Sequence, residues 1–382
     1  MIKMNVLFLQ TQPCIRTLKY AYGFNKTQSD INITFGYTAK TLTEFYGYGD
    51  EFIEKYIKIN TEKNLEEQIK NILNEEKIDL IHSHNTPDFL AVSAINVTTE
   101  IPLIHDIHDL YSIHTAKLRV LEKEKAEKII NDEKIAIENA NALLYVTEGI
   151  KDKLHEKYDV ASKKDMVFPN FVPRSIIPKT IKNKLSKKDG EIHIAYEGNV
   201  NSIVSGDHYD LMDIFSDIAN QNINVHIYSA RDNKEYRKLA EENDKIHYHG
   251  HLNSKKLLKE LTQYDFGWAG FNEKCHKEHL DMVFANKVFE YISAGLPVIT
   301  LPHKLQKEFI EKSNLGMVIN NVYEINDKFE DYDKINQIKS KVAENRYSFC
   351  IEENIEKAVN FYKCVLSENI TSLEPEEVIV KA

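Results

Sequence analysis

Residues 286–300 read Asn-Lys-Val-Phe-Glu-Tyr-Ile-Ser-Ala-Gly-Leu-Pro-Val-Ile-Thr, and this stretch is the most informative about the fold. Its first part has the spacing of an amphipathic helix, Gly295 follows as a stop, and an apolar run begins at Pro297. A glycine just past a helix is a common left-handed end, and a short apolar run without alternation is typical of a strand buried on both faces. The stretch therefore predicts a helix followed by a strand of a parallel sheet.

The same alternation of short apolar runs and longer amphipathic segments continues on both sides of a break. We expect strands at 5–9, 78–82, 102–105, 142–146, 192–196, 225–228, 246–249, 266–269 and 297–301. Three prolines and a Lys-rich segment between 168 and 190 have the texture of an interdomain linker. The predicted fold class is α/β, with two Rossmann-like doubly wound domains facing a central cleft in which a ligand binds at the carboxyl ends of the strands.

Length and composition agree with this division. A chain of 382 residues is too long for one ordinary core, and two domains are the natural expectation. The net charge of −10 argues against a nucleic-acid partner. No apolar run reaches the ~20 residues of a membrane-spanning helix, and Cys14, Cys275, Cys350 and Cys364 show no CxxC spacing. We expect a soluble cytoplasmic protein with reduced thiols, and leave open a weak peripheral contact at the inner membrane face.

Residues 286–300 resemble the donor-binding segment of the retaining glycosyltransferases of family 4 (glycosyl transferases group 1), which have the GT-B fold. The resemblance implies that Glu290 holds the ribose of a nucleotide sugar. It also implies that backbone amides around Ala285, Asn286 and Lys287 face the diphosphate, where a helix start and a lysine both favour an anion. The family has a second glutamate eight positions earlier, where this chain has Met282. The neighbouring Asp281 is a candidate substitute.

A second resemblance to the family covers residues 101–110, Ile-Pro-Leu-Ile-His-Asp-Ile-His-Asp-Leu. It implies that His108 approaches the transferred sugar, with Asp109 either holding its ring tautomer or meeting the acceptor. We expect His105 to be a packed strand histidine. Residues 79–85 match a family strand and turn, which makes His84 and Asn85 candidates for the acceptor side.

The segment Ile194-Ala-Tyr-Glu-Gly-Asn199 resembles the first strand and turn of the family's nucleotide domain. Gly198 would permit close approach of the backbone to the diphosphate, with Asn199 beside it. The Arg and Lys that the family has next are missing from residues 200–208. Positive charge could come from Lys287, from Arg231, or from Arg16 across the cleft. Residues 249–252 match a turn that lies beside the nucleobase in the family, and we expect it to act through backbone groups.

The resemblance implies two domains, at 1–172 and 173–345, with a helix at about 346–368 completing the first and a tail at 369–382. It implies transfer of a sugar from a UDP- or GDP-sugar to a hydroxyl of a glycan, lipid-linked or protein acceptor in cell-surface glycan synthesis. The reaction would retain the anomeric configuration, with the nucleotide sugar as co-substrate and with no metal and no other cofactor.

Other classes of protein remain open. A metal-dependent hydrolase could use His82, His84, His105 and His108, since imidazoles suit zinc or manganese. We expect His82 and His84 to converge only if their strand ends between them. A non-catalytic GT-B partner subunit would explain Met282 and the missing Arg/Lys pair, and an epimerase on the same fold is a third alternative. Nucleotide binding and turnover discriminate among these alternatives.

Overall fold

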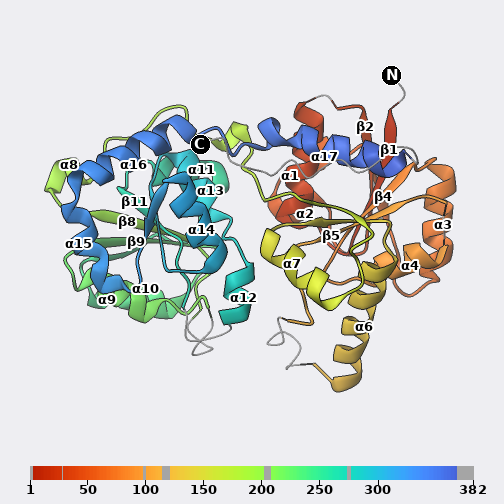
Figure 1. Ribbon diagram of the computed structural model, residues 1–382, viewed down its shortest axis with the longest axis horizontal. Helices are drawn as coiled ribbons and strands as arrows, with labels where there is room; N and C mark the ends of the chain where they lie inside the picture. Colours follow the sequence, from red (N-terminus) through yellow and green to blue (C-terminus); the bar gives the residue numbers. More distant parts are fainter. Residues whose placement is uncertain are drawn as a thin grey trace. The chain divides into compact units, whose positions relative to one another are not determined.

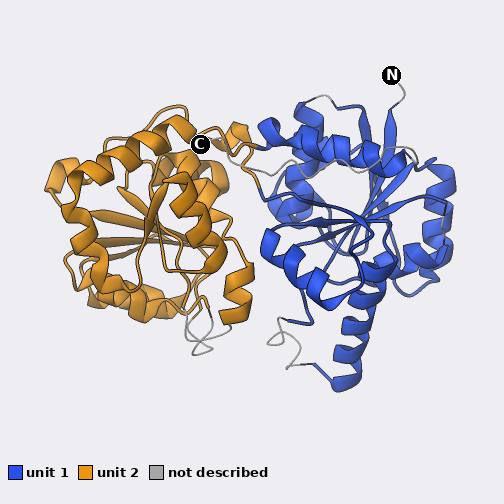
Figure 2. Ribbon diagram, in the orientation of Figure 1, with its two compact units in different colours: residues 1–170, 351–377 blue, residues 171–350, 378–382 orange. Residues whose placement is uncertain are grey.

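The computed structural model describes residues 3–27, 29–97, 100–113, 121–201, 208–272 and 277–367 (Figure 1). The chain divides into two compact units, shown in different colours in Figure 2. The first comprises the chain up to Asn170 together with the final helix α17 (Ile351–Leu366), and the second runs from Phe171 to Cys350. The predicted tail at 369–382 and Cys275 lie outside the described residues.

The first unit is built on a seven-stranded parallel sheet in the order β3-β2-β1-β4-β5-β6-β7. Its strands are β1 (Met4–Gln10), β2 (Ile31–Tyr37), β3 (Lys55–Lys58), β4 (Leu80–His84), β5 (Leu103–Ile107), β6 (Ala142–Tyr145) and β7 (Lys164–Val167). Its helices are α1 (Ile15–Lys26), α2 (Leu42–Tyr46), the 3-10 turn η1 (Asp50–Phe52), α3 (Leu65–Glu75), α4 (Phe89–Val97), α6 (Lys123–Asn139), α7 (Glu148–Lys157) and α17. The central strands are buried on both faces because helices cover the sheet on each side, as the lack of alternation predicted.

Helix α17 packs on α1, although the two are separated by more than 300 residues in the chain. Gly23 makes the close approach possible, since a Cβ there would lie 2.9 Å from the Ile351 side chain. The hydroxyl of Tyr22 also donates a 2.6 Å hydrogen bond to Glu352. Helix α17 is therefore an integral layer of the first unit.

The second unit is built on a six-stranded parallel sheet in the order β10-β9-β8-β11-β12-β13. Its strands are β8 (His193–Gly198), β9 (Asn224–Ser229), β10 (Ile246–Tyr248), β11 (Phe266–Trp268), β12 (Val298–Thr300) and β13 (Gly316–Val318). Its helices are η2 (Arg174–Ile176), α8 (Ser186–Asp189), α9 (Met212–Ala219), α10 (Lys234–Glu242), α11 (Ser254–Leu261), α12 (Lys277–Met282), α13 (Lys287–Ala294), α14 (Lys304–Ser313), η3 (Val322–Glu324), α15 (Ile325–Glu330) and α16 (Tyr332–Asn345).

These two doubly wound α/β units confirm the predicted fold class. Each of the nine expected strands is present, and Gly295 ends α13 with a left-handed φ of +82°. Strands β2, β3, β7 and β13 were not predicted. Among the described residues, no helix combines the length and the apolar character needed to cross a membrane.

Candidate functional site

Strands β8 and β11 mark the point where the strand order of the second sheet reverses. In open parallel sheets, ligands bind at the carboxyl ends of the strands at such a reversal. Strand β8 ends at Gly198, whose φ of +127° suits glycine alone. A Cβ at Gly198 would lie 3.2 Å from Nζ of Lys287. The glycine therefore lets the backbone and the lysine head group meet at the reversal point.

Lys287 is the first residue of α13 and is only 7% exposed. Its buried Nζ has no hydrogen-bond partner in the described part of the chain, and it lies 4.0 Å from the ring centroid of Tyr196 and 5.4 Å from that of Phe271. Burial lowers the pKa of Lys287 to about 8, although the charges of Glu197 and Glu290 oppose the shift. A buried ammonium group with unsatisfied hydrogens is costly, so this arrangement suits an anionic ligand that completes it.

Tight packing fixes α13 against the sheet. A Cβ at Gly267 would lie 2.3 Å from the ring of Tyr291, so the helix rests directly on β11. The Tyr291 hydroxyl accepts a hydrogen bond from the Glu197 N–H at 3.0 Å and donates one to the Trp268 carbonyl at 3.1 Å. These bonds join α13 to β8 and β11, and they hold the start of the helix close to Gly198.

The other residues predicted to bind the donor differ in exposure and in hydrogen bonding. Glu290 is partly exposed one turn beyond Lys287, and Asn199 and Arg231 are exposed just after β8 and β9. Ala285 requires a correction, because its N–H donates to the Gln306 side chain at 3.1 Å and is not available to a diphosphate. No local pattern around residue 285 indicates this long-range bond.

A buried ion pair lies at the carboxyl end of β5 in the first unit. Asp106 is fully buried, and Nε of Arg16 donates to its two carboxylate oxygens at 2.8 and 2.9 Å. The rest of the guanidinium donates to the Phe168 carbonyl, to Asn170 and to the Tyr20 hydroxyl. Burial alone would raise the pKa of Asp106, but Arg16, His82 and His84 together outweigh burial and hold this pKa well below its ordinary value. Arg16 is thus an internal partner of Asp106, which corrects its predicted role toward a phosphate or acceptor.

His82 and His84 both lie within strand β4, and their rings stack with centroids 4.4 Å apart. The expectation that the strand must end between them was wrong, because residues two apart in a strand share a face. His82 contacts the Tyr362 hydroxyl and Asp106. His84 is 2% exposed, and burial lowers its pKa well below the ordinary value. It is therefore an internal residue and does not line a surface, which corrects its predicted place on the acceptor side.

The four histidines of the metal-hydrolase alternative do not form one cluster. His82, His84 and Asp106 bring ligand atoms within 4.8 Å of one another. His105 instead contacts Asp88 at 3.3 Å and Ser83 at 2.8 Å, as a packed strand histidine. Because the Arg16 guanidinium binds both oxygens of Asp106, the carboxylate that a metal would need is already paired with a cation.

The turn after β5 carries His108 and is braced by Asn85. The Asn85 side chain accepts from the His108 N–H at 3.1 Å and donates to the Asp109 carbonyl. The His108 Nε2 lies 3.4 Å from the Thr86 hydroxyl, and the Asp109 carboxylate accepts from the Leu110 N–H at 3.0 Å. Asn85, which is 1% exposed, therefore positions this turn from inside the unit and does not line a surface.

Comparison with known proteins shows which families this chain is similar to. Residues 63–175 match the family described as Glycosyltransferase Family 4, and residues 205–355 match the Glucosyltransferase 3-like, C-terminal domain. Both matches are to glycosyltransferase domains, and they cover separate parts of the chain. They agree with the resemblance inferred from residues 286–300 and 101–110. No curated protein sequence matches the chain.

Solved structures share the GT-B fold at low sequence identity. Sucrose-phosphate synthase from Thermosynechococcus elongatus is 11% identical with a TM-score of 0.69, covering 95% of this chain and 99% of that chain. A glycosyltransferase from Rickettsia africae is 13% identical with a TM-score of 0.70, covering 96% and 100%. Anabaena Alr3699/HepE, solved in complex with UDP-glucose, is 15% identical with a TM-score of 0.66, covering 94% and 99%.

This chain departs from the pattern of the family that it resembles at the end of α12. Met282 is 7% exposed where the family has its first glutamate. The neighbouring Asp281 accepts a 3.3 Å hydrogen bond from the Lys304 N–H at the start of α14. Asp281 is thus engaged at a helix terminus, where a carboxylate is stabilised.

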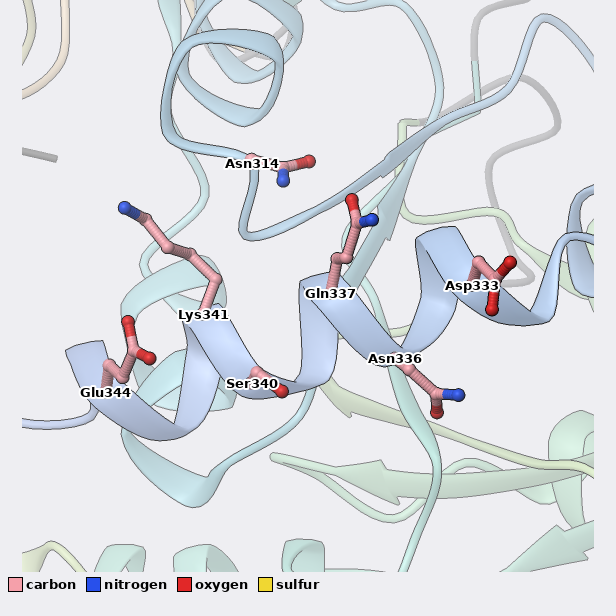
Figure 3. Close-up of a pocket in the computed structure, with 7 residues that line it drawn as sticks. All are labelled: Asn314, Asp333, Asn336, Gln337, Ser340, Lys341 and Glu344. Atoms are coloured by element: carbon pink, nitrogen blue, oxygen red, sulfur yellow. The ribbon is translucent and has the colours of Figure 1, made fainter.

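A shallow groove of about 600 Å³ lies elsewhere on the second unit of this GT-B chain. It is lined by polar side chains, Asn314, Asp333, Asn336, Gln337, Ser340, Lys341 and Glu344, of which Gln337 and Lys341 project from α16 on the side of the segment that carries Asn314 (Figure 3). Asn314 ends α14 and precedes β13, so the groove lies at the amino-terminal edge of the sheet. That edge is opposite the carboxyl ends of the strands, and we assign the groove no part in the donor site.

Proposed function

We propose that the chain transfers a sugar from a UDP- or GDP-sugar to a hydroxyl acceptor in cell-surface glycan synthesis, with retention of configuration and without a metal. The observation that carries this proposal is the buried ammonium of Lys287 beside Gly198, at the reversal of the second sheet. A diphosphate would supply the missing hydrogen-bond acceptors and the opposite charge. The same cation would stabilise the charge that develops on the leaving diphosphate.

The other residues of the site have roles consistent with this chemistry. Glu290 lies one turn from Lys287, where its carboxylate can accept hydrogen bonds from a ribose diol. His108 and Asp109, on the turn braced by Asn85, would shape the sugar and acceptor side. The structural relative from Anabaena was solved with UDP-glucose, which supports a nucleotide sugar as the donor class.

Thermal unfolding of the full chain with UDP, GDP, ADP and CMP, each with and without EDTA, tests the donor site. We expect UDP or GDP to raise the midpoint, because a ligand that binds the native state stabilises it. The shift should persist in EDTA. If no nucleotide shifts the midpoint, the proposal is wrong, and a shift that vanishes in EDTA contradicts metal independence.

Two variants then separate binding from transfer. Glu290→Ala should weaken UDP or GDP binding at least about tenfold, as expected for loss of charged hydrogen bonds. Glu308→Ala, an exposed glutamate on α14, is the matched control. His108→Ala should abolish sugar transfer while nucleotide binding stays near normal. A chain that binds nucleotide but shows no turnover with any donor would instead be a non-catalytic partner subunit.

A further inference from the structure

Four histidines lie on one face of strands β8, β9 and β10 in the second unit. His193, His226 and His247 belong to the three strands, and His249 follows β10 by one residue. The register pairs His226 with His247 and Ala195, and alternation places His193 and His249 on the same face. Three of these rings form a hydrogen-bonded series, His193–His226–His249, which we call the imidazole chain.

Asp189 fixes the direction of the imidazole chain. Its carboxylate contacts Nε2 of His193 at 3.0 Å, and an ionised carboxylate can only accept, so His193 carries its proton on Nε2. Nδ1 of His193 is then an acceptor for Nε2–H of His226 at 2.8 Å. Nδ1 of His226 in turn accepts from Nε2–H of His249 at 3.0 Å. Neutral His249 is therefore left with a lone pair on Nδ1.

The Nδ1 lone pair of His249 lies at the carboxyl edge of the sheet, just after β10. Nδ1 finds no hydrogen-bond partner within the described ranges, and His249 is exposed. The ring also stacks on Tyr228 with centroids 4.6 Å apart, and Tyr228 pairs with Glu197 across β9 and β8. Lys287 lies beside Glu197 at the end of β8.

The spacing from Lys287 to His249 fits a nucleotide. Strands β8 and β10 are two strands apart, and adjacent strands are about 4.8 Å apart, so their ends are separated by about 10 Å. This span matches the extent of a nucleotide from its diphosphate to the far edge of its base. A diphosphate at Lys287 would thus bring the base to Tyr228 and His249.

We propose that His249 determines base specificity by accepting a hydrogen bond from the ring N–H of uracil or guanine, and that Asp189 fixes the required tautomer through the imidazole chain. This inference rests on the proposed function. Adenine and cytosine present a lone pair where uracil and guanine present N–H, so they would face His249 with two acceptors and no hydrogen. A polar site rejects a ligand that leaves its groups unpaired.

The groups around His249 keep its ring neutral at pH 7. Burial and the neighbouring His247 lower the pKa of His249, whereas Glu260 of α11 opposes them. His226 and Tyr228 of β9 are the other titratable groups in contact with the ring, and Tyr264, after α11, bonds to Tyr228. In acid, a proton on Nδ1 converts the acceptor into a donor, which favours cytosine N3 over uracil N3–H.

Calorimetric titration of the full chain with UDP, GDP, CDP and ADP at pH 8 and pH 5.5 tests the inference. At pH 8 we expect UDP or GDP to bind at least about tenfold tighter than CDP and ADP, and the tighter of the two identifies the base. The ratio of UDP to CDP affinity, or of GDP to ADP affinity, should shrink several-fold at pH 5.5.

Variants test the two roles separately. His249→Leu should weaken UDP or GDP about tenfold, whereas the control His247→Leu, outside the imidazole chain, should not. Asp189→Asn, at an exposed position, should shrink the ratio of UDP affinity to CDP affinity even at pH 8, because His249 can then carry its proton on Nδ1. If UDP or GDP binds the wild type but both variants keep its affinity and ratio, the inference is wrong and the proposed function stands. If no nucleotide binds the wild type at pH 8, both fail.

Discussion

Replacing Lys287 by Met should make the free protein more stable and its nucleotide binding weaker. Burial lowers the pKa of this lysine from 10.5 to about 8. At about 1.36 kcal/mol per pKa unit, keeping the charged lysine buried costs the folded state roughly 3 kcal/mol. Methionine has a similar length and no charge, so Lys287→Met should recover up to about 3 kcal/mol. A charged hydrogen bond to a diphosphate contributes about 1.5–3 kcal/mol, so UDP or GDP affinity should fall about 10- to 100-fold.

Urea unfolding and calorimetric titration measure these two effects. The exposed Lys255 on α11 provides a matched control, and Lys255→Met should change neither quantity appreciably. Between pH 8 and pH 10, the unfolded chain keeps the Lys287 proton while the folded chain loses it. The stability of the wild type should therefore rise with pH relative to Lys287→Met, by up to about 1.4 kcal/mol per pH unit. Destabilisation by Lys287→Met with unchanged nucleotide affinity would refute a ligand-binding role and would make this lysine a structural residue.

Three further predictions concern stability and the donor turn. Arg16→Met should lower the free energy of unfolding, measured in urea, by about 3–5 kcal/mol, because Asp106 is left as an unpaired buried charge. The double variant with Asp106→Asn should recover part of this loss. A loss under about 1 kcal/mol would show that the ion pair is not needed for stability. Burial and the neighbouring histidines lower the pKa of His226 to about 2, so the unfolded chain binds a proton that the folded chain does not, and stability should fall by about 1.4 kcal/mol per pH unit below 6.5. His226→Gln should flatten this acid dependence in urea titrations at pH 7 and pH 5, and an unchanged slope would count against it. Gly198→Ala places a Cβ 3.2 Å from Lys287 Nζ at a φ of +127°. It should lower the free energy of unfolding in urea by about 1–2 kcal/mol and weaken UDP or GDP binding in calorimetric titration. Unchanged affinity would show that the ligand does not need a close approach to the backbone at residue 198.

Apolar patterning was sufficient to predict the fold class because the central strands are buried by helices on both faces. The strands that the prediction missed carry a weaker apolar signal. Lys55–Lys58 and Lys164–Val167 are edge strands with polar residues and only partial burial. Ile31–Tyr37 mixes Asn and Thr with its apolar residues, and Gly316–Val318 has only three residues. Such segments become strands by pairing with a neighbour, and their own composition does not reveal this.

The sequence by itself determined the two α/β halves and the helix and glycine stop at 287–295, and it predicted donor-site roles for Lys287 and Gly198. These features are local, since helix spacing, a left-handed glycine and an apolar run are each encoded within a few residues. The tertiary structure decided the partners of buried polar groups. Arg16 meets Asp106, the Ala285 N–H meets Gln306, and three histidines meet across three strands. These pairs are separated by 21 to 90 residues, so only the folded sheet and its covering helices bring their atoms within hydrogen-bonding distance.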